Sequence, residues 1–395
     1  MKLLVFAHRL DLGGTQAHAI EMAARLRDRH GYQIVFHAGA GPLQQMMDDH
    51  RLPLVVSPDA RFQPSLARMR VLRELVAREK PDLIHAWDAW QGIEAFCAVH
   101  MTMQVPLIIS DMGMTLSHML PRQVTTTFGV LAVQQQAQQQ GWQRSAHLPL
   151  PLDLNRNAPD AIDRQQARDV MRVGRDDLLI VAMARLTHSM KAESLLHMIE
   201  CLRRLGRQLP LRLAIVGDGG ARAELQHMAT RANRELGRKA ISLPGAMTDP
   251  RPAYAAADMV IGMGASALRG MAFGKPVIVT GDLAFARLFD PGTAEWFTAN
   301  GLHGVGDDDD GYAMQRLIVQ LATDPQLRDR LGRFGRDHVT RHHDLDRLSD
   351  DFAALCRTAR DVPPQPTVGG AMRSAVIYLR ERRFRASCFR GLGET

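Results

Sequence analysis

Residues 260–279 of the sequence read VIGMGASALRGMAFGKPVIV, and this stretch predicts the class of fold. It starts and ends in short apolar runs, which are typical of buried strands in a parallel sheet. Between them Ser266 stands where a helix N-cap is expected. Residues 267–273 then predict one short helix, which Gly274 and Pro276 terminate. A strand, a loop, a helix and a second strand in this order form a βαβ unit, so the chain around it is expected to be an α/β protein.

The loop of this unit is rich in glycine and comes directly before the helix. It consists of Gly262, Met263, Gly264, Ala265 and Ser266. Backbone N–H groups at the start of a helix, together with the positive end of its dipole, suit an anion such as a phosphate. A G-x-G turn before a helix is a weak signal by itself, because many such turns only connect two elements tightly. The loop is therefore a candidate phosphate site, and other motifs in the chain are needed to support this interpretation.

The composition is that of a globular protein with two domains. The chain has 395 residues, which exceeds what one hydrophobic core usually holds, and 46% of them are hydrophobic and 23% charged. Its four cysteines lie far apart and lack the spacing of a zinc site or a disulfide framework, which favours a cytoplasmic protein. The apolar run at residues 3–7 is too short for a signal peptide, and no run approaches the ~20 residues that span a bilayer.

Strands and helices alternate through the first half of the sequence. Apolar runs predict six strands, at residues 2–6, 32–37, 54–57, 81–87, 106–110 and 129–133. Helices are expected at residues 17–27 and 64–78, and the glutamine-rich residues 134–140 are expected to cover a helix face. This alternation predicts a doubly wound parallel sheet, whose ligands bind beyond the carboxyl ends of the strands.

The second half repeats the pattern. Strands are expected at residues 178–183, 211–216 and 241–243, ahead of the two in residues 260–279, and helices at residues 194–205, 221–234 and 252–256. The predicted architecture is α/β, with two Rossmann-like doubly wound parallel-sheet domains that face each other across a cleft. We place the first domain at residues 1–150, a linker at 151–165 and the second domain at 166–340. A helix is expected at 341–362, which either packs back on the first domain or does not, and a basic tail at 363–395.

The net charge of +7 is concentrated at the end of the chain. Residues 371–395 hold six Arg and two Glu. Such a segment suits an anionic membrane surface or an acidic substrate, and a solvated or docked helix is an equally good interpretation. Peripheral contact with the inner face of a membrane is thus one hypothesis, and no nucleic-acid partner is expected. The acidic run at residues 307–310 lacks the spaced ligands of a calcium loop and is interpreted as a solvated loop.

Several motifs occur in the order expected of one enzyme family. They are the Gly13-Gly14 turn after the first strand, PDLIHAWD at residues 81–88, ARLTHSMK at 184–191, IVGDG at 215–219, and AAADMVIGMG followed by GMAFGKPVIV at 255–279. With these motifs the chain resembles a retaining glycosyltransferase of family 4 (glycosyl transferase group 1), with the two-Rossmann glycosyltransferase-B (GT-B) fold. The similarity extends from residue 1 to about residue 359.

The resemblance gives the glycine loop a function. Enzymes of this family transfer a hexose-type sugar from a nucleoside-diphosphate sugar to a hydroxyl acceptor. The resemblance implies that Arg185 and Lys191 clamp the diphosphate and that the loop from Gly262 to Ser266 adds backbone N–H donors. Gly13 and Gly14 are then expected to close the site from the first domain. No cofactor and no metal are implied, because preorganised cations and N–H groups neutralise the leaving phosphate.

Three positions depart from the family pattern. The family's E-x7-E carboxylates, which bind the donor sugar and the ribose, are replaced by Ile261 and Arg269. Arg269 either contacts a phosphate or nucleotide hydroxyl or lies on the helix surface. Where the family has T-x-H at the end of the fifth strand, this chain has Ser110-Asp111-Met112, and Asp111 is the nearest polar substitute for the His. Asp111 either hydrogen-bonds a donor or acceptor hydroxyl or only shapes a turn. His85 on the neighbouring strand either supplies an imidazole or lies in the core.

The acceptor is not encoded in a motif. Trp87 and Trp90 are the best candidates for a cleft wall, and the methionines between residues 112 and 119 favour core packing. A glycan, a lipid-linked sugar and a small natural product all remain open as acceptors. The altered positions also allow a catalytically silent subunit that binds a nucleotide sugar or a partner protein. A phosphorylase of the same fold is disfavoured, because the chain is too short and shows no context for a pyridoxal-binding lysine.

Overall fold

The structure is a computed structural model, and it describes residues 1–60, 62–188, 192–306 and 312–362. The chain divides into two compact units. The first unit joins Met1–Pro151 with the segment that begins at Leu345, and the second is Leu152–Asp344. Within the described residues, no helix combines the length and the apolar character that crossing a membrane requires.

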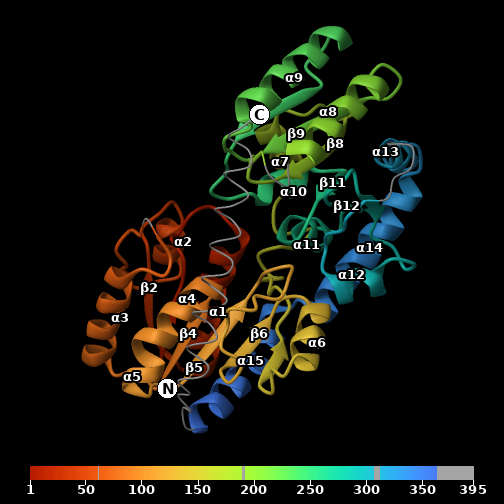
Figure 1. Cartoon of the computed structure of the whole chain (residues 1–395). Helices are drawn as coiled ribbons and strands as arrows, with labels where there is room; N and C mark the ends of the chain where they lie inside the picture. Colours follow the sequence, from red (N-terminus) through yellow and green to blue (C-terminus); the bar gives the residue numbers. More distant parts are fainter. Residues whose placement is uncertain (61, 189–191, 307–311, 363–395) are drawn as a thin grey trace, which may run out of the picture. The chain divides into compact units, whose positions relative to one another are not determined.

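The sheet of the first unit has seven strands in the described part of the chain (Figure 1). They are β1 (Lys2–Phe6), β2 (Gln33–Ala38), β3 (Leu54–Val56), β4 (Leu83–Trp87), β5 (Leu107–Asp111), β6 (Thr125–Phe128) and β7 (Ser145–His147). Their order is β3-β2-β1-β4-β5-β6-β7, and all neighbours are parallel. Leu3 and Val5 of β1 join one core cluster, and Leu4 and Phe6 join another. The central strands are apolar on both sides because both faces are covered.

Helices provide that cover. The face with Leu3 and Val5 carries α1 (Gly14–His30), α2 (Gln44–Asp49) and α15 (Leu345–Asp361). The other face carries α3 (Leu66–Glu79), α4 (Ala89–Ala95), the π-helical turn η1 (Phe96–His100), α5 (Met101–Met103) and α6 (Leu131–Gln139). Arg25 of α1 forms an ion pair of 2.6 Å with Asp346 of α15. The last described helix therefore packs within the first unit.

The second unit has a six-stranded sheet within the described residues (Figure 1). The strands are β8 (Leu178–Met183), β9 (Leu211–Val216), β10 (Ile241–Gly245), β11 (Met259–Gly262), β12 (Val277–Thr280) and β13 (Ala286–Leu288). The order is β10-β9-β8-β11-β12-β13, and only β13 runs antiparallel to its neighbour. Residues 260–279 thus contribute two adjacent parallel strands and the helix between them.

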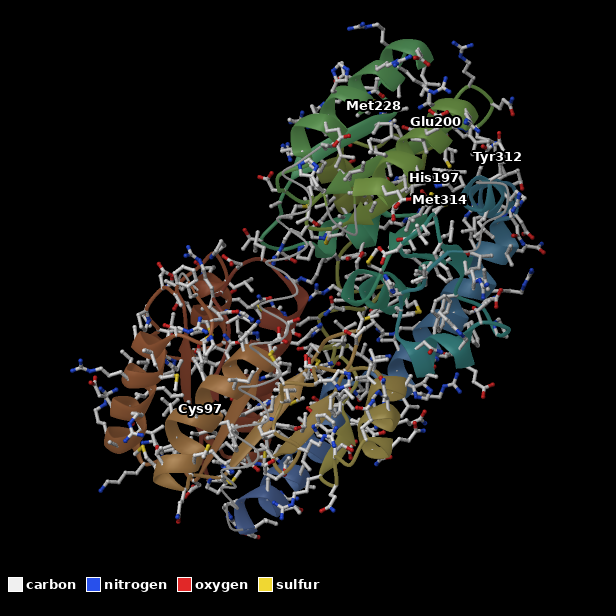
Figure 2. All side chains as sticks on the ribbon, in the orientation of Figure 1. Cys97, His197, Glu200, Met228, Tyr312 and Met314 are labelled. Atoms are coloured by element: carbon white, nitrogen blue, oxygen red, sulfur yellow. The ribbon has the colours of Figure 1, made fainter. Side chains whose placement is uncertain are left out.

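Helices cover both faces here too. One core cluster brings α8 (Ala192–Leu205), α9 (Arg222–Leu236) and α13 (Ala313–Thr323) onto the sheet. Figure 2 shows Tyr312 and Met314, at the start of α13, beside His197 and Glu200 of α8. On the opposite face, Gly270 of α11 (Ala265–Ala272) lies directly against Val260, and α14 (Pro325–His342) packs on α11. The remaining helices are α7 (Arg164–Met171), α10 (Arg251–Ala256) and α12 (Ala294–Asn300).

Two local predictions are wrong. The strand expected at residues 129–133 is β6, Thr125–Phe128, and the chain from Leu131 onward belongs to α6. Three consecutive threonines give β6 little apolar character, although β-branched residues favour strands and all three are buried here. The second correction concerns Ser266, which lies inside the first turn of α11, whereas Gly264 is the N-cap.

The prediction of two Rossmann-like, doubly wound parallel-sheet domains is confirmed. In each sheet the strand order reverses beside the first strand of the unit, because β1 neighbours β4 and β8 neighbours β11. At such a switch point the two connecting segments leave toward opposite faces. The carboxyl ends of the two strands therefore border an open crevice, which is where α/β sheets bind ligands.

Candidate active site

The loop after β8 carries Arg185 to the switch point of the second sheet. Backbone hydrogen bonds attach this loop to the one after β9: Leu186 N–H donates to Asp218 O (2.9 Å), and Ala221 N–H donates to Leu186 O (2.9 Å). Gly217 permits the contact, since a Cβ at this residue would lie 1.9 Å from Ala184 O. The side chain of Arg185 is exposed, and these hydrogen bonds to the loop after β9 hold the backbone from which it extends.

Some predicted features lie outside the described residues. Lys191, the second predicted cation, follows the described part of the loop that carries Arg185. The acidic run 307–310 and the Arg-rich residues 371–395 are likewise outside the described ranges. The assignments made for these three parts of the sequence stay predictions.

The glycine loop joins β11 to α11, next to β8. Gly264 has φ 55° and ψ −129°, a backbone conformation that favours glycine. Two of the loop's N–H groups are already used, because Gly264 N–H donates to Leu302 O (2.8 Å) and Ser266 N–H to Met263 O (3.3 Å). The N–H groups of Ala265 and Ala267, in the first turn of α11, have no acceptor within the helix. The loop therefore offers an anion fewer donors than the sequence suggested, and those two are the candidates.

Glycine is also required at the end of β11. A Cβ at Gly262 would lie 2.5 Å from Ser266 Oγ, so the hydroxyl of Ser266 fills the space that a larger residue at 262 would need. Ser266 Oγ is buried. The Ser266 side chain thus packs inside the turn that joins β11 to α11.

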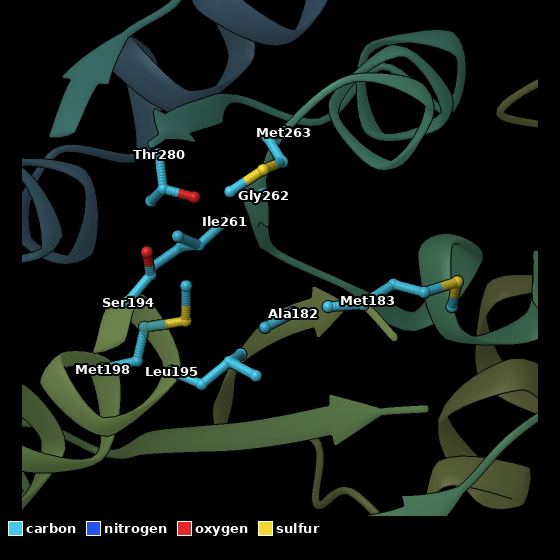
Figure 3. A pocket seen from close by; sticks show the side chains of 10 residues that line it. Ala182, Met183, Ser194, Leu195, Met198, Ile261, Gly262, Met263 and Thr280 are labelled. Atoms are coloured by element: carbon cyan, nitrogen blue, oxygen red, sulfur yellow. The ribbon is translucent and has the colours of Figure 1, made fainter. Parts of the chain in front are cut away.

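A small pocket lies at the carboxyl ends of β8, β11 and β12 (Figure 3). The residues that line it are Ala182, Met183, Ala184, Ser194, Leu195, Met198, Ile261, Gly262, Met263 and Thr280. Its empty volume is about 270 Å³ when the open solvent at its mouth is included. Ser194, in the first turn of α8, donates its hydroxyl to Gly281 O (3.1 Å). The pocket borders both the loop with Arg185 and the glycine loop.

The two positions that depart from the E-x7-E pattern differ in their surroundings. Ile261 is 1% exposed and belongs to the core cluster under α8. Arg269 is half-buried on α11 and lies near Tyr254. Burial raises the pKa of the Tyr254 phenol, and the positive charge of Arg269 opposes this increase. Arg269 is thus partly buried among the packed helices, and its predicted contact with a nucleotide stays a prediction.

In the first unit, Asp111 ends β5 at the carboxyl edge of the sheet. It is 1% exposed, and its Oδ1 accepts a hydrogen bond from Gly113 N–H (3.1 Å). Burial, together with the negative charge of Asp88, raises the pKa of Asp111 to about 6. Asp111 Oδ2 is buried and has no hydrogen-bond partner among the described residues. Hydrogen bonds from Gly113 and Ser117 oppose this increase in the pKa. The predicted contact of Asp111 with a donor or acceptor hydroxyl stays a prediction.

His85 and Trp87 lie in the interior, each 1% exposed. His85 Nε2 shares a hydrogen bond with Ser110 Oγ (2.7 Å), and its ring lies 4.5 Å from that of Phe352. Burial lowers the pKa of His85 to about 3, which keeps the ring neutral. Both residues are buried because β4 is covered on both faces, which agrees with the core alternative for His85. Their predicted contact with a sugar stays a prediction. Trp90, at the start of α4, is only half-buried and stays a candidate.

Gly13 precedes α1 and Gly14 is its first residue, at the same edge of the sheet. Gly13 is the N-cap of α1 with an extended backbone (φ −165°), so its conformation does not by itself require glycine. The carbonyl of Gly13 accepts the first hydrogen bond of the helix, from Ala17 N–H (3.2 Å). Their predicted role in closing the site stays a prediction.

Sequence reasoning included Asp88 in the candidate cleft wall but missed its pairing with His8. His8 Nε2 lies 3.6 Å from Asp88 Oδ2, beyond the carboxyl ends of β1 and β4, at the switch point of the first sheet. Asp88 has φ 82° and ψ 160°, a strained conformation that is rare outside glycine and that often marks functional positions. The PDLIHAWD motif contains Asp88, but only the fold brings His8 to it.

The site residues thus form two groups, each at the carboxyl edge of one sheet. In the parts of the chain that the structure describes, no three His, Cys, Asp or Glu side chains gather as they would around a metal ion. The predicted independence of metals and cofactors is not tested by this observation.

Sequence profiles match both units. The profile for Glycosyltransferase Family 4 matches residues 12–128, and the profile for Glycosyl transferases group 1 matches residues 177–324. The chain belongs to glycosyltransferase family 4. This glycosyltransferase is matched over β2 to β6 of its first sheet and over β8 to β13 of its second, so the family and the transferase class expected from the motifs are confirmed. Comparison with curated protein sequences gives no match.

Solved structures similar to this glycosyltransferase share its fold. A glycosyltransferase from Rickettsia africae ESF-5 has a TM-score of 0.69 at 14% identity, covering 91% of this chain and 99% of that one. Anabaena HepE in complex with UDP-glucose has a TM-score of 0.71 at 16% identity, covering 91% and 100%. Sucrose-phosphate synthase from Thermosynechococcus elongatus has a TM-score of 0.68 at 14% identity, covering 90% and 98%. At these identities the likeness establishes the GT-B fold alone.

Proposed function

We propose that this glycosyltransferase moves a sugar from a nucleoside-diphosphate sugar to a hydroxyl acceptor, with retention of configuration at the anomeric carbon. The observation that carries the proposal is the arrangement at the switch point of the second sheet. There the fixed loop with Arg185 and the glycine loop before α11 flank one pocket. HepE, which shares the fold, was solved with UDP and with UDP-glucose, and this supports a nucleotide-sugar donor.

Charge neutralisation is the chemistry that these residues supply. When the bond between the anomeric carbon and the β-phosphate oxygen breaks, negative charge develops on the phosphate. The guanidinium of Arg185 offers a planar set of donors, and Lys191 is assigned as a compact second cation. The N–H groups of Ala265 and Ala267 and the dipole of α11 add to them. Preorganised donors of this kind stabilise a transition state without a metal or a cofactor.

The acceptor side of the reaction is assigned to the first sheet. We propose a front-face mechanism, in which the acceptor hydroxyl attacks from the side that the phosphate leaves. The leaving phosphate takes the acceptor proton, so no protein nucleophile is required. Asp111 then holds a donor or acceptor hydroxyl through its unpartnered Oδ2, and Trp90 forms part of a wall beside it. The acceptor is a glycan, a lipid-linked sugar or a small natural product.

A second candidate function is a catalytically silent subunit that binds a nucleotide sugar or a partner protein. The observation that favours it is the absence of any carboxylate from the lining of the described pocket, where Ile261 stands in the wall. Binding of a donor without its turnover is the behaviour this alternative predicts.

A panel of UDP-, GDP- and dTDP-sugars separates the two candidates. A donor at about a hundred times its Kd adds roughly 2.7 kcal/mol to the free energy of unfolding, which a thermal shift detects. An active enzyme also hydrolyses its donor slowly and transfers the sugar when an acceptor is present. Binding without hydrolysis or transfer would favour the silent subunit. The absence of any binding would reject the enzyme and would leave only a silent subunit that binds a partner protein.

The Arg-rich tail is proposed to hold the enzyme at the inner face of a membrane. Deletion of residues 371–395 is expected to abolish binding to vesicles that contain anionic lipid, because those residues supply the positive charge. Binding that is unchanged by the deletion would remove the membrane contact from the account.

A further inference from the structure

The pocket at the switch point of the second sheet is lined mostly by carbon and sulfur. Leu195, Met198, Ile261 and Met263 contribute apolar side chains to its wall, and no charged side chain is among the described lining residues (Figure 3). The pocket itself is narrow: the volume in which the centre of a water-sized group can lie is about 20 Å³. This is enough for one group of the size of a water molecule or a methyl group.

Polar partners for such a group are scarce. Ser194 Oγ already donates to Gly281 O, and Thr280 presents its hydroxyl at one wall (Figure 3). A buried water makes about three hydrogen bonds, and a sugar hydroxyl can donate one and accept two. The hydroxyls of Thr280 and Ser194 can supply only part of these bonds, and the other described lining side chains supply none. A group without polar atoms fits this lining better than either.

The pocket is also next to the proposed phosphate site. Gly262 and Met263 form part of the pocket wall and of the glycine loop at once. In a nucleoside-diphosphate sugar, the sugar is bonded directly to the phosphate that this loop would hold. The part of the donor that enters the pocket is therefore a substituent of its sugar ring.

We propose that the pocket receives the C6 methyl group of a 6-deoxyhexose, so that the preferred donor is a nucleoside-diphosphate 6-deoxyhexose. C6 is the carbon that projects from a hexose ring, and it carries a methyl group in 6-deoxy sugars and a hydroxymethyl group in ordinary hexoses. Burial of the methyl group against Met198 and Ile261 stabilises the complex, whereas the extra hydroxyl loses hydrogen bonds to water. This inference rests on the proposed function, because it assumes that a nucleotide sugar binds.

Pairs of donors that differ only at O6 test the inference. Suitable pairs are dTDP-glucose with dTDP-6-deoxyglucose, GDP-mannose with GDP-6-deoxymannose, and UDP-N-acetylglucosamine with its 6-deoxy analogue. For the nucleotide that binds, we expect the 6-deoxy donor to have a kcat/KM for hydrolysis, or an affinity, that is higher by about 10- to 100-fold. Equal use of both members, or preference for the hydroxylated one, overturns the inference.

The nucleotides alone show which proposal has failed. If UDP, GDP or dTDP binds but the O6 pairs are not distinguished, the pocket assignment is wrong and the proposed function stands. If neither the nucleotides nor any nucleotide sugar binds, the proposed function is rejected, and the inference is rejected with it.

A pair of methionine variants locates the effect. Met263 is half-buried in the pocket wall, and Met263→Gln adds an amide that can bond the O6 hydroxyl. We expect this variant to reduce the preference to within about 3-fold. Met228 on α9 is also half-buried but does not line the pocket (Figure 2), so Met228→Gln is the matched control and keeps the full preference. An unchanged preference in Met263→Gln would show that O6 lies elsewhere.

Discussion

The carbonyl oxygen of Ala184 occupies the space where a side chain at Gly217 would begin. A Cβ at residue 217 would lie 1.9 Å from this oxygen, and the backbone there has a φ of 147°. The contact joins the loops after β8 and β9. It therefore fixes the segment from which Arg185 extends.

We expect Gly217→Ala to lower the free energy of unfolding by more than about 2 kcal/mol, because the clash adds to an unfavourable φ. Gly237 is a matched control, since it also has a positive φ (68°) but no atom within 4 Å of a Cβ. Gly237→Ala should cost only about 1 kcal/mol. Urea unfolding of both variants measures the difference, and equal costs would show that the loop contact adds nothing.

The carboxyl of Asp111 makes stability depend on pH. Its pKa is about 6 in the folded protein and 3.8 in its ordinary state. The folded protein therefore keeps the proton to higher pH, and stability decreases as the pH rises from about 4 to about 6. The full effect is about 3 kcal/mol. In Asp111→Asn this contribution is absent, so the variant should gain stability relative to wild type between pH 4 and pH 7. Urea unfolding at both pH values gives the result, and a constant difference would contradict the buried carboxyl.

Asp88 is expected to set part of that pKa. Its negative charge raises the pKa of Asp111, so Asp88→Asn should lower the pKa of the Asp111 carboxyl. Asparagine retains the side-chain oxygen that caps α4. Side-chain carbon NMR of Asp111 across pH 3 to 8 measures the shift. Asp59→Asn, which changes an exposed carboxylate paired with Arg9, is the control and should leave the Asp111 titration unchanged.

Much of the fold could be predicted because the strands of a doubly wound sheet are short apolar runs that end in recognisable turns. Residues 2–6, 178–183 and 211–216 coincide with β1, β8 and β9. Thr125–Phe128 was missed since its threonines resemble a loop in hydropathy. The start of the helix that follows it was assigned to a strand, because Val130 and Val133 read as part of an apolar run. Only its glutamine-rich second half was expected to be helical.

The sequence predicted the residues of the candidate site only where a single loop contains them. Arg185 and the glycine loop belong to local motifs, and the fold places both at one switch point. The His8–Asp88 pair, by contrast, joins residues 80 positions apart, which no local pattern connects. The burial of Trp87 was equally hidden, since a strand end is exposed or buried according to what packs above it. For His85 a core position was one of two alternatives, which the sequence alone left open. In this chain Phe352, far along the sequence, packs against His85.

Donor turnover by variants of two arginines tests the central claim, that Arg185 neutralises the leaving phosphate. Arg185 follows the carboxyl end of β8, and the equally exposed Arg175 precedes the amino end of the same strand. With the donor found in the panel, Arg185→Ala should reduce kcat/KM for hydrolysis or transfer by about 100-fold or more, at unchanged stability. Arg175→Ala should match the wild type. Equal activity of the two variants would contradict the account.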